Sequence, residues 1–279
     1  MKKQQRASGH VSALLLRTLV RFAALLTAVV LVFLVGYILF KGVPHLTPSL
    51  FAWEYNSNNV SLMPALVNTI CMTLLSLLIA VPLGICAAIY LVEYAKRGNR
   101  LVELVRITAE TLSGIPSIVY GLFGMLFFVT TLGWGLSLLS GAFTLSIMIL
   151  PLIMRTTEEA LKAVPDSFRE GSFGLGAGRL RTVFKIVLPS AVPGILAGVI
   201  LAIGRIVGET AALMYTAGTV AEVPKNLLSS TRTLSVHMYV LSNEGLYIDQ
   251  TYATAVVLLV IVVGINALSG YLARKITRE

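Results

Sequence analysis

The chain has 279 residues, of which 56% are hydrophobic and only 13% are charged, whereas an ordinary globular domain carries roughly 25% charged residues. This composition excludes a water-soluble globular domain and indicates an integral membrane protein. The net charge is +9, but in a membrane chain the positions of the basic residues must be considered before nucleic-acid binding is inferred.

Six apolar runs are long enough to cross a hydrocarbon core of about 30 Å as helices of roughly 20 residues. They lie near Leu19–Phe40, Ala65–Val92, Ile115–Leu132, Leu136–Met154, Val192–Met214 and Tyr252–Leu272. Lipid offers no hydrogen bonds to the backbone, so runs of this length predict helices rather than strands. The predicted fold class is therefore all-α integral membrane, with six transmembrane helices.

The chain is expected to form one membrane domain in three parts. Residues 1–63 are predicted to hold the first transmembrane helix and an external loop, residues 64–273 a five-helix core, and residues 274–279 a short tail. The first apolar run is too long for a cleavable signal, and no small-residue cleavage site follows it, so we expect a retained helix.

Lysine and arginine gather on one side of the predicted membrane. That side holds Lys2, Lys3, Arg6, Arg17, Arg21, Lys96, Arg97, Arg100, Arg106, Arg155, Lys162, Arg169, Arg179, Arg181, Lys185, Arg274, Lys275 and Arg278. The opposite side holds Lys41, Lys225 and Arg232. By the positive-inside rule, both termini and the loop at residues 156–190 face the cytoplasm. This orientation accounts for the positive charge without a nucleic-acid partner.

The loop at residues 156–190 is too polar for lipid and rich in helix-forming residues. A short helix is predicted over Thr157–Val164, and Asp166 or Ser167 is expected to cap a second helix that carries Glu170. Glycine accepts a positive φ angle without steric cost, so the turn after this helix is expected among Gly174, Gly176 and Gly178. Two interpretations stay open at this point: a compact knob that a partner protein grips, or a solvated loop that only returns the chain to the membrane.

The spacing within this loop resembles that of the ABC importer permeases. In that family Glu-Ala-Ala is followed by glycine after three residues and by Ile-x-Leu-Pro after nine more. The residues in register here are Glu170, Gly171, Ser172, Gly176, Ile186, Leu188 and Pro189. Gly171 and Ser172 stand where the family usually has two alanines, and the glycine weakens the local helix by about 1 kcal/mol. The resemblance implies that these residues form a coupling helix that docks on a partner ATPase.

Three stretches resemble the phosphate-specific permeases of that family. They are SGIPSIVYGLFG (Ser113–Gly124), RTTEEALKAVPDSFREGSFGLGA (Arg155–Ala177) and LAIGRIVGETAAL (Leu201–Leu213). The resemblance covers the chain from about Met63 onward, and the overall length resembles the PstA subunits. It implies a MetI-like type I importer permease core over residues 64–273, in a bacterial inner membrane, that moves inorganic phosphate.

The same resemblance implies three partners: a homologous PstC-like permease, a PstB-like ATPase dimer and a PstS-like external phosphate-binding protein. No GxxxxGK[ST] motif occurs in the chain, so ATP and Mg are assigned to the ATPase. We expect no catalytic residue, metal or cofactor in this chain. A permease for molybdate or sulfate stays open as an alternative, as does an ion-coupled secondary transporter, which would need carboxylates at mid-membrane.

Arg205 and Glu209 interrupt the fifth apolar run. Each costs about 2.5–3.5 kcal/mol at the centre of a spanning helix, so an intramembrane charge indicates a functional site. Four positions apart, they are expected to share one helix face, and Gly204 and Gly208 would allow a close approach. Two interpretations stay open: an ion pair that joins helices, or a substrate pathway in which Arg205 binds phosphate beside Glu209 and Thr210. In the phosphate permeases this arginine and the Gly-Glu-Thr after it recur.

Two further features of the sequence have open interpretations. Arg155, at the inner end of the fourth run, is either a second anion site on the pathway or an interfacial anchor. The segment Ser113–Gly121 contains glycine, proline and serine at the start of the third run. It is either a broken helix that lines the pathway or a packing kink.

Overall fold

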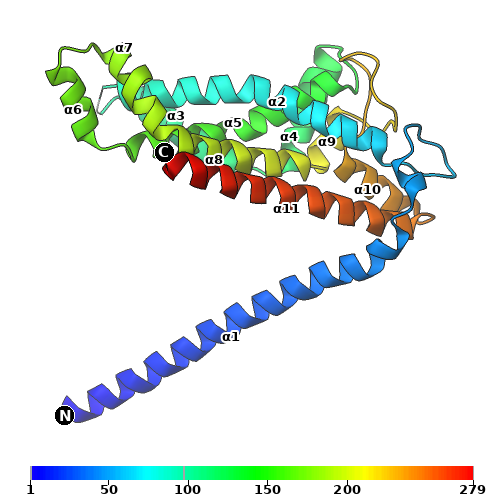
Figure 1. Cartoon of the computed structure of the whole chain (residues 1–279), viewed down its shortest axis with the longest axis horizontal. Helices are drawn as coiled ribbons and strands as arrows, with labels where there is room; N and C mark the ends of the chain where they lie inside the picture. Colours follow the sequence, from blue (N-terminus) through cyan, green and yellow to red (C-terminus); the bar gives the residue numbers. More distant parts are fainter. Residues whose placement is uncertain (1, 97, 279) are drawn as a thin grey trace.

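The computed structural model describes the backbone of residues 2–96 and 98–278, and the side chains of residues 15–96, 98–268, 270 and 271. The described chain is helical, without strands (Figure 1). The following basic residues of the orientation argument have side chains outside the described residues: Lys2, Lys3, Arg6, Arg97, Arg274, Lys275 and Arg278. Residue 279 of the predicted tail also lies outside.

Fourteen of the helical segments build the bundle and its two ends, and the first thirteen follow in chain order. They are α1 (Lys2–Gly42), α2 (Met63–Ile89), η3 (Tyr90–Tyr94), α3 (Arg100–Ser113), α4 (Ser117–Gly124), η4 (Met125–Thr131), α5 (Leu138–Lys162), α6 (Asp166–Gly174), α7 (Arg179–Thr182), η5 (Val183–Val187), α8 (Leu188–Val207), α9 (Ala211–Thr216) and α10 (Leu234–Glu244). The last helix is α11 (Ile248–Arg278). The segments η3, η4 and η5 are π-helical turns that continue their neighbours.

Five helices of the described part are long and apolar enough to cross a membrane. Their bounds are Leu15–His45, Met63–Tyr94, Leu138–Lys162, Arg179–Val207 and Ile248–Leu268. A bent pair, Arg100–Ser113 and Ser117–Thr131, whose axes differ by 103°, makes six spans when it is counted as one. The prediction of six spans is confirmed on this count, but the predicted third run covered only the second half of the pair. The first half, α3, carries charged residues and lies outside the six predicted apolar runs.

Two other predicted boundaries were wrong. The segment Thr157–Val164 is not a separate helix, because α5 continues to Lys162. Its last turns leave the apolar stretch yet stay helical, and Lys162 pairs there with Glu158 four residues earlier at 2.6 Å. The fifth span begins at Arg179 rather than Val192, because α7, η5 and α8 form one continuous helix.

The centre of the bundle is built on close contacts at glycine. A Cβ atom on Gly84 of α2 would lie 2.8 Å from Cγ2 of Ile153 in α5. One on Gly194 of α8 would lie 2.6 Å from Cβ of Ala160, also in α5. In lipid the hydrophobic effect does not drive helices together, and small residues let helix backbones approach closely enough to pack. The helices α2, α5 and α8 are thereby joined, with α5 in the middle.

Helix α1 meets the rest of the bundle mainly at its C-terminal end. There Gly42 packs directly on the Tyr252 backbone of α11, and Figure 1 shows α1 leaving the bundle from this point. Side chains farther back, such as Phe22 and Leu31, are exposed. Figure 1 also shows α6 and α7 at one end of the bundle, which we call the hairpin end, with the C-terminus of α11 beside them. The connections at residues 43–62 and 217–233 lie at the opposite, far end.

Candidate functional site

The predicted fifth helix is interrupted at its functional residues. Helix α8 ends at Val207 and α9 begins at Ala211. In the break Glu209 is 9% exposed; its Oε1 accepts a hydrogen bond from the Ala212 amide at 3.1 Å, and its carbonyl accepts one from Ser235 Oγ at 2.6 Å. Glu209 therefore accepts a hydrogen bond from a free amide in the first turn of α9, and its own carbonyl links the break to Ser235 of α10. The prediction that it shares a helix face with Arg205 was wrong, because helical periodicity ends before Glu209.

Arg205 lies on the last turn of α8, half-buried. Among the described residues it has neither a hydrogen bond nor an ion pair, although its charge acts on the Tyr120 hydroxyl. Its helix face is open: a Cβ on Gly204 would meet no atom within 4 Å, and Leu201 one turn earlier is 59% exposed. An intramembrane guanidinium without a carboxylate partner is suited to receive an anion. The ion-pair interpretation of Arg205 and Glu209 is excluded within this chain.

A second interrupted helix meets the first. Between α3 and α4 the chain turns by 103°, so Ser113–Gly121 is a broken helix rather than a packing kink. Just after the turn, a Cβ on Gly121 would lie 2.8 Å from Cα of Ala212 in α9. Tyr120 donates a hydrogen bond back across the turn to the Leu112 carbonyl at 2.7 Å. The two breaks therefore pack together, backbone on backbone, next to Arg205.

Thr210 points into a different space from Arg205. It lines an apolar pocket of about 510 Å³ together with residues of α1, α4, α9, α10 and α11. Arg205 is not among the residues of that pocket. The structure thus brings Arg205, Glu209 and Thr210 to one break but gives each a different surrounding.

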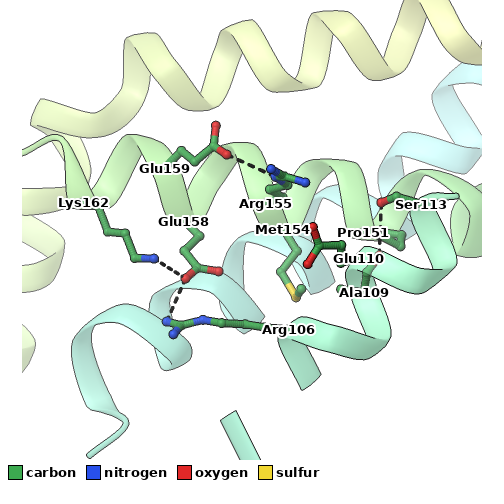
Figure 2. A pocket seen from close by; sticks show the side chains of 10 residues that line it. All are labelled: Arg106, Ala109, Glu110, Ser113, Pro151, Met154, Arg155, Glu158, Glu159 and Lys162. Atoms are coloured by element: carbon green, nitrogen blue, oxygen red, sulfur yellow. Dashed lines mark hydrogen bonds and ion pairs between the residues drawn. The ribbon is translucent and has the colours of Figure 1, made fainter. Parts of the chain in front are cut away.

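Arg155 lies apart, in a pocket of about 240 Å³ between α3 and α5 (Figure 2). Its Nε is 3.2 Å from Oε1 of Glu159 in an exposed pair. On the same wall Glu158 is held between Arg106 and Lys162, at 2.7 and 2.6 Å. Two of the three carboxylates that line this pocket, those of Glu158 and Glu159, pair with basic side chains, which is typical of a charged rim at a membrane interface. The pocket also reaches Ser113, at the turn between α3 and α4.

Helices α6 and α7 form the predicted hairpin (residues 166–182), which we call the coupling hairpin after the role that the resemblance implies. Gly176 has φ +79°; its amide bonds to the Phe173 carbonyl, and the next amide, of Ala177, bonds to the Ser172 carbonyl. This pair of bonds is a Schellman motif, with glycine in the left-handed position. Of the three glycines proposed for the turn, Gly176 alone has a positive φ angle.

Glu170 and Gly171 are exposed on α6, whereas Ser172 is buried and its hydroxyl lies 2.8 Å from that of Thr182. The serine that departs from the alanine pattern therefore joins the two arms of the coupling hairpin. The other three residues of the predicted pattern lie in the continuous helix that re-enters the bundle. Ile186 and Leu188 are half-buried there, and Pro189 is exposed.

Three residues with strong interactions were not selected from the sequence. Arg169 of α6 was counted only as a basic residue, and it binds Glu93 of η3 at 2.7 Å. At the far end Arg232 is buried with its guanidinium 4.7 Å from the centre of the Tyr55 ring. His237 beside them is fully buried, with its ring centre 6.1 Å from that of Tyr55. All three are contacts between segments far apart in the chain, so no local pattern marks them.

The fold and these sites define a multi-pass membrane permease with an exposed helical hairpin at one end. The chain belongs to the family of binding-protein-dependent transport system inner membrane components, whose family model matches residues 80–278. Membership implies an ATPase and a substrate-binding protein as partners, and a transmembrane channel subunit rather than an enzyme.

Individual relatives and structures agree with this family. The chain is 35% identical to the probable ABC transporter permease protein YqgI of Bacillus subtilis over 246 residues, 81% of this chain and 82% of that protein. It is 33% identical to the phosphate transport system permease protein PstA 1 of Mycobacterium tuberculosis, covering 77% and 70%. Its fold matches a chain of a bacterial alginate ABC transporter bound to its periplasmic protein, with a TM-score of 0.65, 18% identity and coverage of 94% and 96%.

Proposed function

We propose that this chain is the PstA-type permease subunit of an ATP-driven importer that moves inorganic phosphate across a bacterial inner membrane. The observation that carries the proposal is Arg205, a half-buried guanidinium without an anionic partner among the described residues, at the meeting point of two broken helices. Relatives that are named phosphate transport permeases, at 33% identity over 77% of the chain, support the choice of anion.

In this proposal the open face of α8 lines the pathway together with a homologous PstC-like subunit. Leu201, Arg205 and Gly208 lie on that face, one turn apart, and leave room for a second chain. A planar fork of donors suits phosphate oxygens, and a site on a pathway must release what it binds. The Glu209 carboxylate accepts a hydrogen bond from α9 and does not pair with Arg205, so the positive charge of Arg205 stays available to the substrate.

The coupling hairpin would face the cytoplasm, where a PstB-like ATPase dimer binds ATP and Mg and docks on α6. The described basic side chains at the hairpin end, among them Arg106, Lys162 and Arg179, support this orientation by the positive-inside rule. Both termini would then be cytoplasmic. A PstS-like protein would deliver phosphate at the far end, where the connections at residues 43–62 and 217–233 lie.

The test is phosphate uptake by the complete complex in proteoliposomes, with ATP inside and the loaded binding protein outside. Arg205→Gln is expected to abolish uptake, and Arg205→Lys to reduce it at least about tenfold, because a point charge replaces a bidentate fork. The matched control is Arg100→Gln, which removes an exposed arginine at the start of α3 and is expected to leave uptake unchanged.

Three results would contradict the proposal. Normal uptake in both Arg205 variants would remove this residue from the mechanism. Inhibition of uptake by molybdate or sulfate at lower concentrations than by unlabelled phosphate would indicate a permease for another oxyanion. Uptake by this chain alone, driven by an ion gradient without ATP, would indicate a secondary transporter.

A further inference from the structure

The guanidinium of Arg169 joins three helices at the hairpin end. Its side chain is only 15% exposed. Nη2 and Nε donate to Oε1 of Glu93, at 2.7 and 3.2 Å. Nη2 also donates to the Leu161 carbonyl at 2.9 Å, and Nη1 to the Val164 carbonyl at 2.8 Å. One side chain of α6 therefore binds both the end of α2, through η3, and the end of α5.

The partners of Arg169 are suited to hold it firmly. Glu93 is 9% exposed and has no other ion-pair partner among the described side chains. The two carbonyls lie where α5 ends, at the negative end of its dipole. Arginine presents a rigid fork that serves several acceptors at once. A second carboxylate, Asp166, also lies 3.1 Å from Nη1, but it is 79% exposed, so water and salt weaken that pair.

Helix α6 also has exposed side chains. Phe168 and Phe173 are 49% and 47% exposed, and Glu170 is exposed. In the proposed function these side chains are available to the ATPase, whereas Arg169 and Ser172 contact other helices of this chain. Besides the bond of Ser172 to Thr182 in α7, the Arg169 bonds are the polar links from α6 to other helices among the described residues.

The helices that Arg169 binds, α2 and α5, are in packing contact with α8, the helix that carries Arg205. Helix α5 is joined to α2 at Gly84 and Ile153, and to α8 at Gly194 and Ala160. Interiors packed this closely transmit displacement rather than absorb it. We infer that Arg169 is a positioning residue that carries the movement of α6 into α2 and α5. This inference rests on the proposed function, in which the ATPase moves α6.

The experiment measures phosphate imported per ATP hydrolysed by the complete complex. Arg169→Gln and Glu93→Gln are each expected to lower this ratio about tenfold, while the ATPase still co-purifies and still hydrolyses ATP. Arg169→Lys, which keeps the charge but not the fork, is expected to lie between. The double variant is expected to be no worse than Arg169→Gln alone, because both changes remove one link.

Asp166→Asn is the matched control, since it removes the exposed carboxylate partner of the same arginine and is expected to leave the ratio unchanged. A uniform loss of ATPase binding in the Arg169 variants would mean that this residue only holds the hairpin folded, and would overturn the inference. A wild-type ratio in Arg169→Gln would overturn it as well.

A second readout uses nucleotide alone. Binding of a non-hydrolysable ATP analogue to the wild-type complex is expected to change amide hydrogen exchange at residues 90–94 and 159–164, and Arg169→Gln is expected to abolish that change. If the wild-type complex imports no phosphate, the proposed function fails, and this exchange measurement still decides the inference. An unaltered exchange response in Arg169→Gln would contradict it.

Discussion

Arg205 and Glu209 lie four positions apart in the chain yet do not pair: Glu209 accepts a hydrogen bond from the Ala212 amide at 3.1 Å, and Arg205 faces the open side of α8. The charge of Glu209 is used within the fold, at the N-terminus of α9. No carboxylate pairs with Arg205 among the described residues. For this reason the proposed function gives the substrate to Arg205 and a structural role to Glu209.

Changes at Glu209 are therefore expected to affect stability. Glu209→Gln keeps an oxygen that can accept from the Ala212 amide, whereas Glu209→Ala leaves that buried amide without its partner. Loss of such a cap costs about 1 kcal/mol, so Glu209→Ala is expected to unfold at a lower temperature than Glu209→Gln in detergent. Phosphate uptake by Glu209→Gln is expected to stay near the wild-type rate. Loss of uptake in a stable Glu209→Gln protein would show that its charge acts on the pathway.

The sequence was sufficient to predict six spans, with the bent pair counted as one, and a helical hairpin at residues 166–182. Apolar length indicates a span, and the turn expected among three glycines is made at one of them, Gly176, which has a positive φ angle. The interruption before Glu209 was not foreseen, because Ala211–Thr216 is apolar and helix-forming, and hydropathy does not distinguish one helix from two. The turn between α3 and α4 was foreseen only as one of two options.

The contacts of Arg169 could not be predicted, for a different reason. Its partner Glu93 lies 76 positions away, and neither residue interrupts an apolar run. From the sequence alone, Arg169 and Glu93 are each expected to be solvated charges near the membrane surface. Ser172 is similar: the sequence marks it as a departure from alanine, and only the structure gives it a partner, the Thr182 hydroxyl.

The contact between the two broken helices gives a second prediction. Gly121→Ala is expected to force α4 away from α9, because the added Cβ would lie 2.8 Å from a backbone atom of Ala212. Overpacking of this kind costs about 1–3 kcal/mol, so we expect a lower unfolding temperature and loss of uptake. Gly114→Ala is the control, since its Cβ would meet only the Thr111 carbonyl at 3.5 Å. Equal effects in both variants would contradict the packing argument.

The turn of the coupling hairpin gives a third prediction. Gly176 has φ +79° with free space around it, so Gly176→Ala is opposed by backbone strain alone, about 1–2 kcal/mol. Gly171→Ala, within α6 and equally unobstructed, is expected to stabilise that helix by about 1 kcal/mol. Amide hydrogen exchange over residues 168–177 is expected to be faster in the first variant and slower in the second. Slower exchange in Gly176→Ala would contradict the left-handed turn.

His237 in α10 gives a prediction on pH. Burial, and next the charge of Arg232, lower the pKa of His237 to about 3, against about 6.5 for a histidine in an unfolded chain. The Tyr55 ring covers another side, with its centroid 6.1 Å away. Between pH 3 and 6.5 the unfolded chain thus binds more protons than the folded one. The resulting stability is complete above about pH 6.5 and is lost as the pH falls toward 3.

At pH 5 the loss is about 2 kcal/mol. The unfolding temperature of the wild-type protein is therefore expected to fall between pH 7.5 and pH 5 by more than that of His237→Gln, which has no proton to gain there. His45→Gln is the matched control, because it removes a histidine whose side chain is 42% exposed and leaves His237 with its buried surroundings. If His237→Gln loses as much stability as the wild-type protein over this interval, His237 does not stay neutral in the folded state, and the buried pairing of Arg232 with Tyr55 must accommodate a second positive charge.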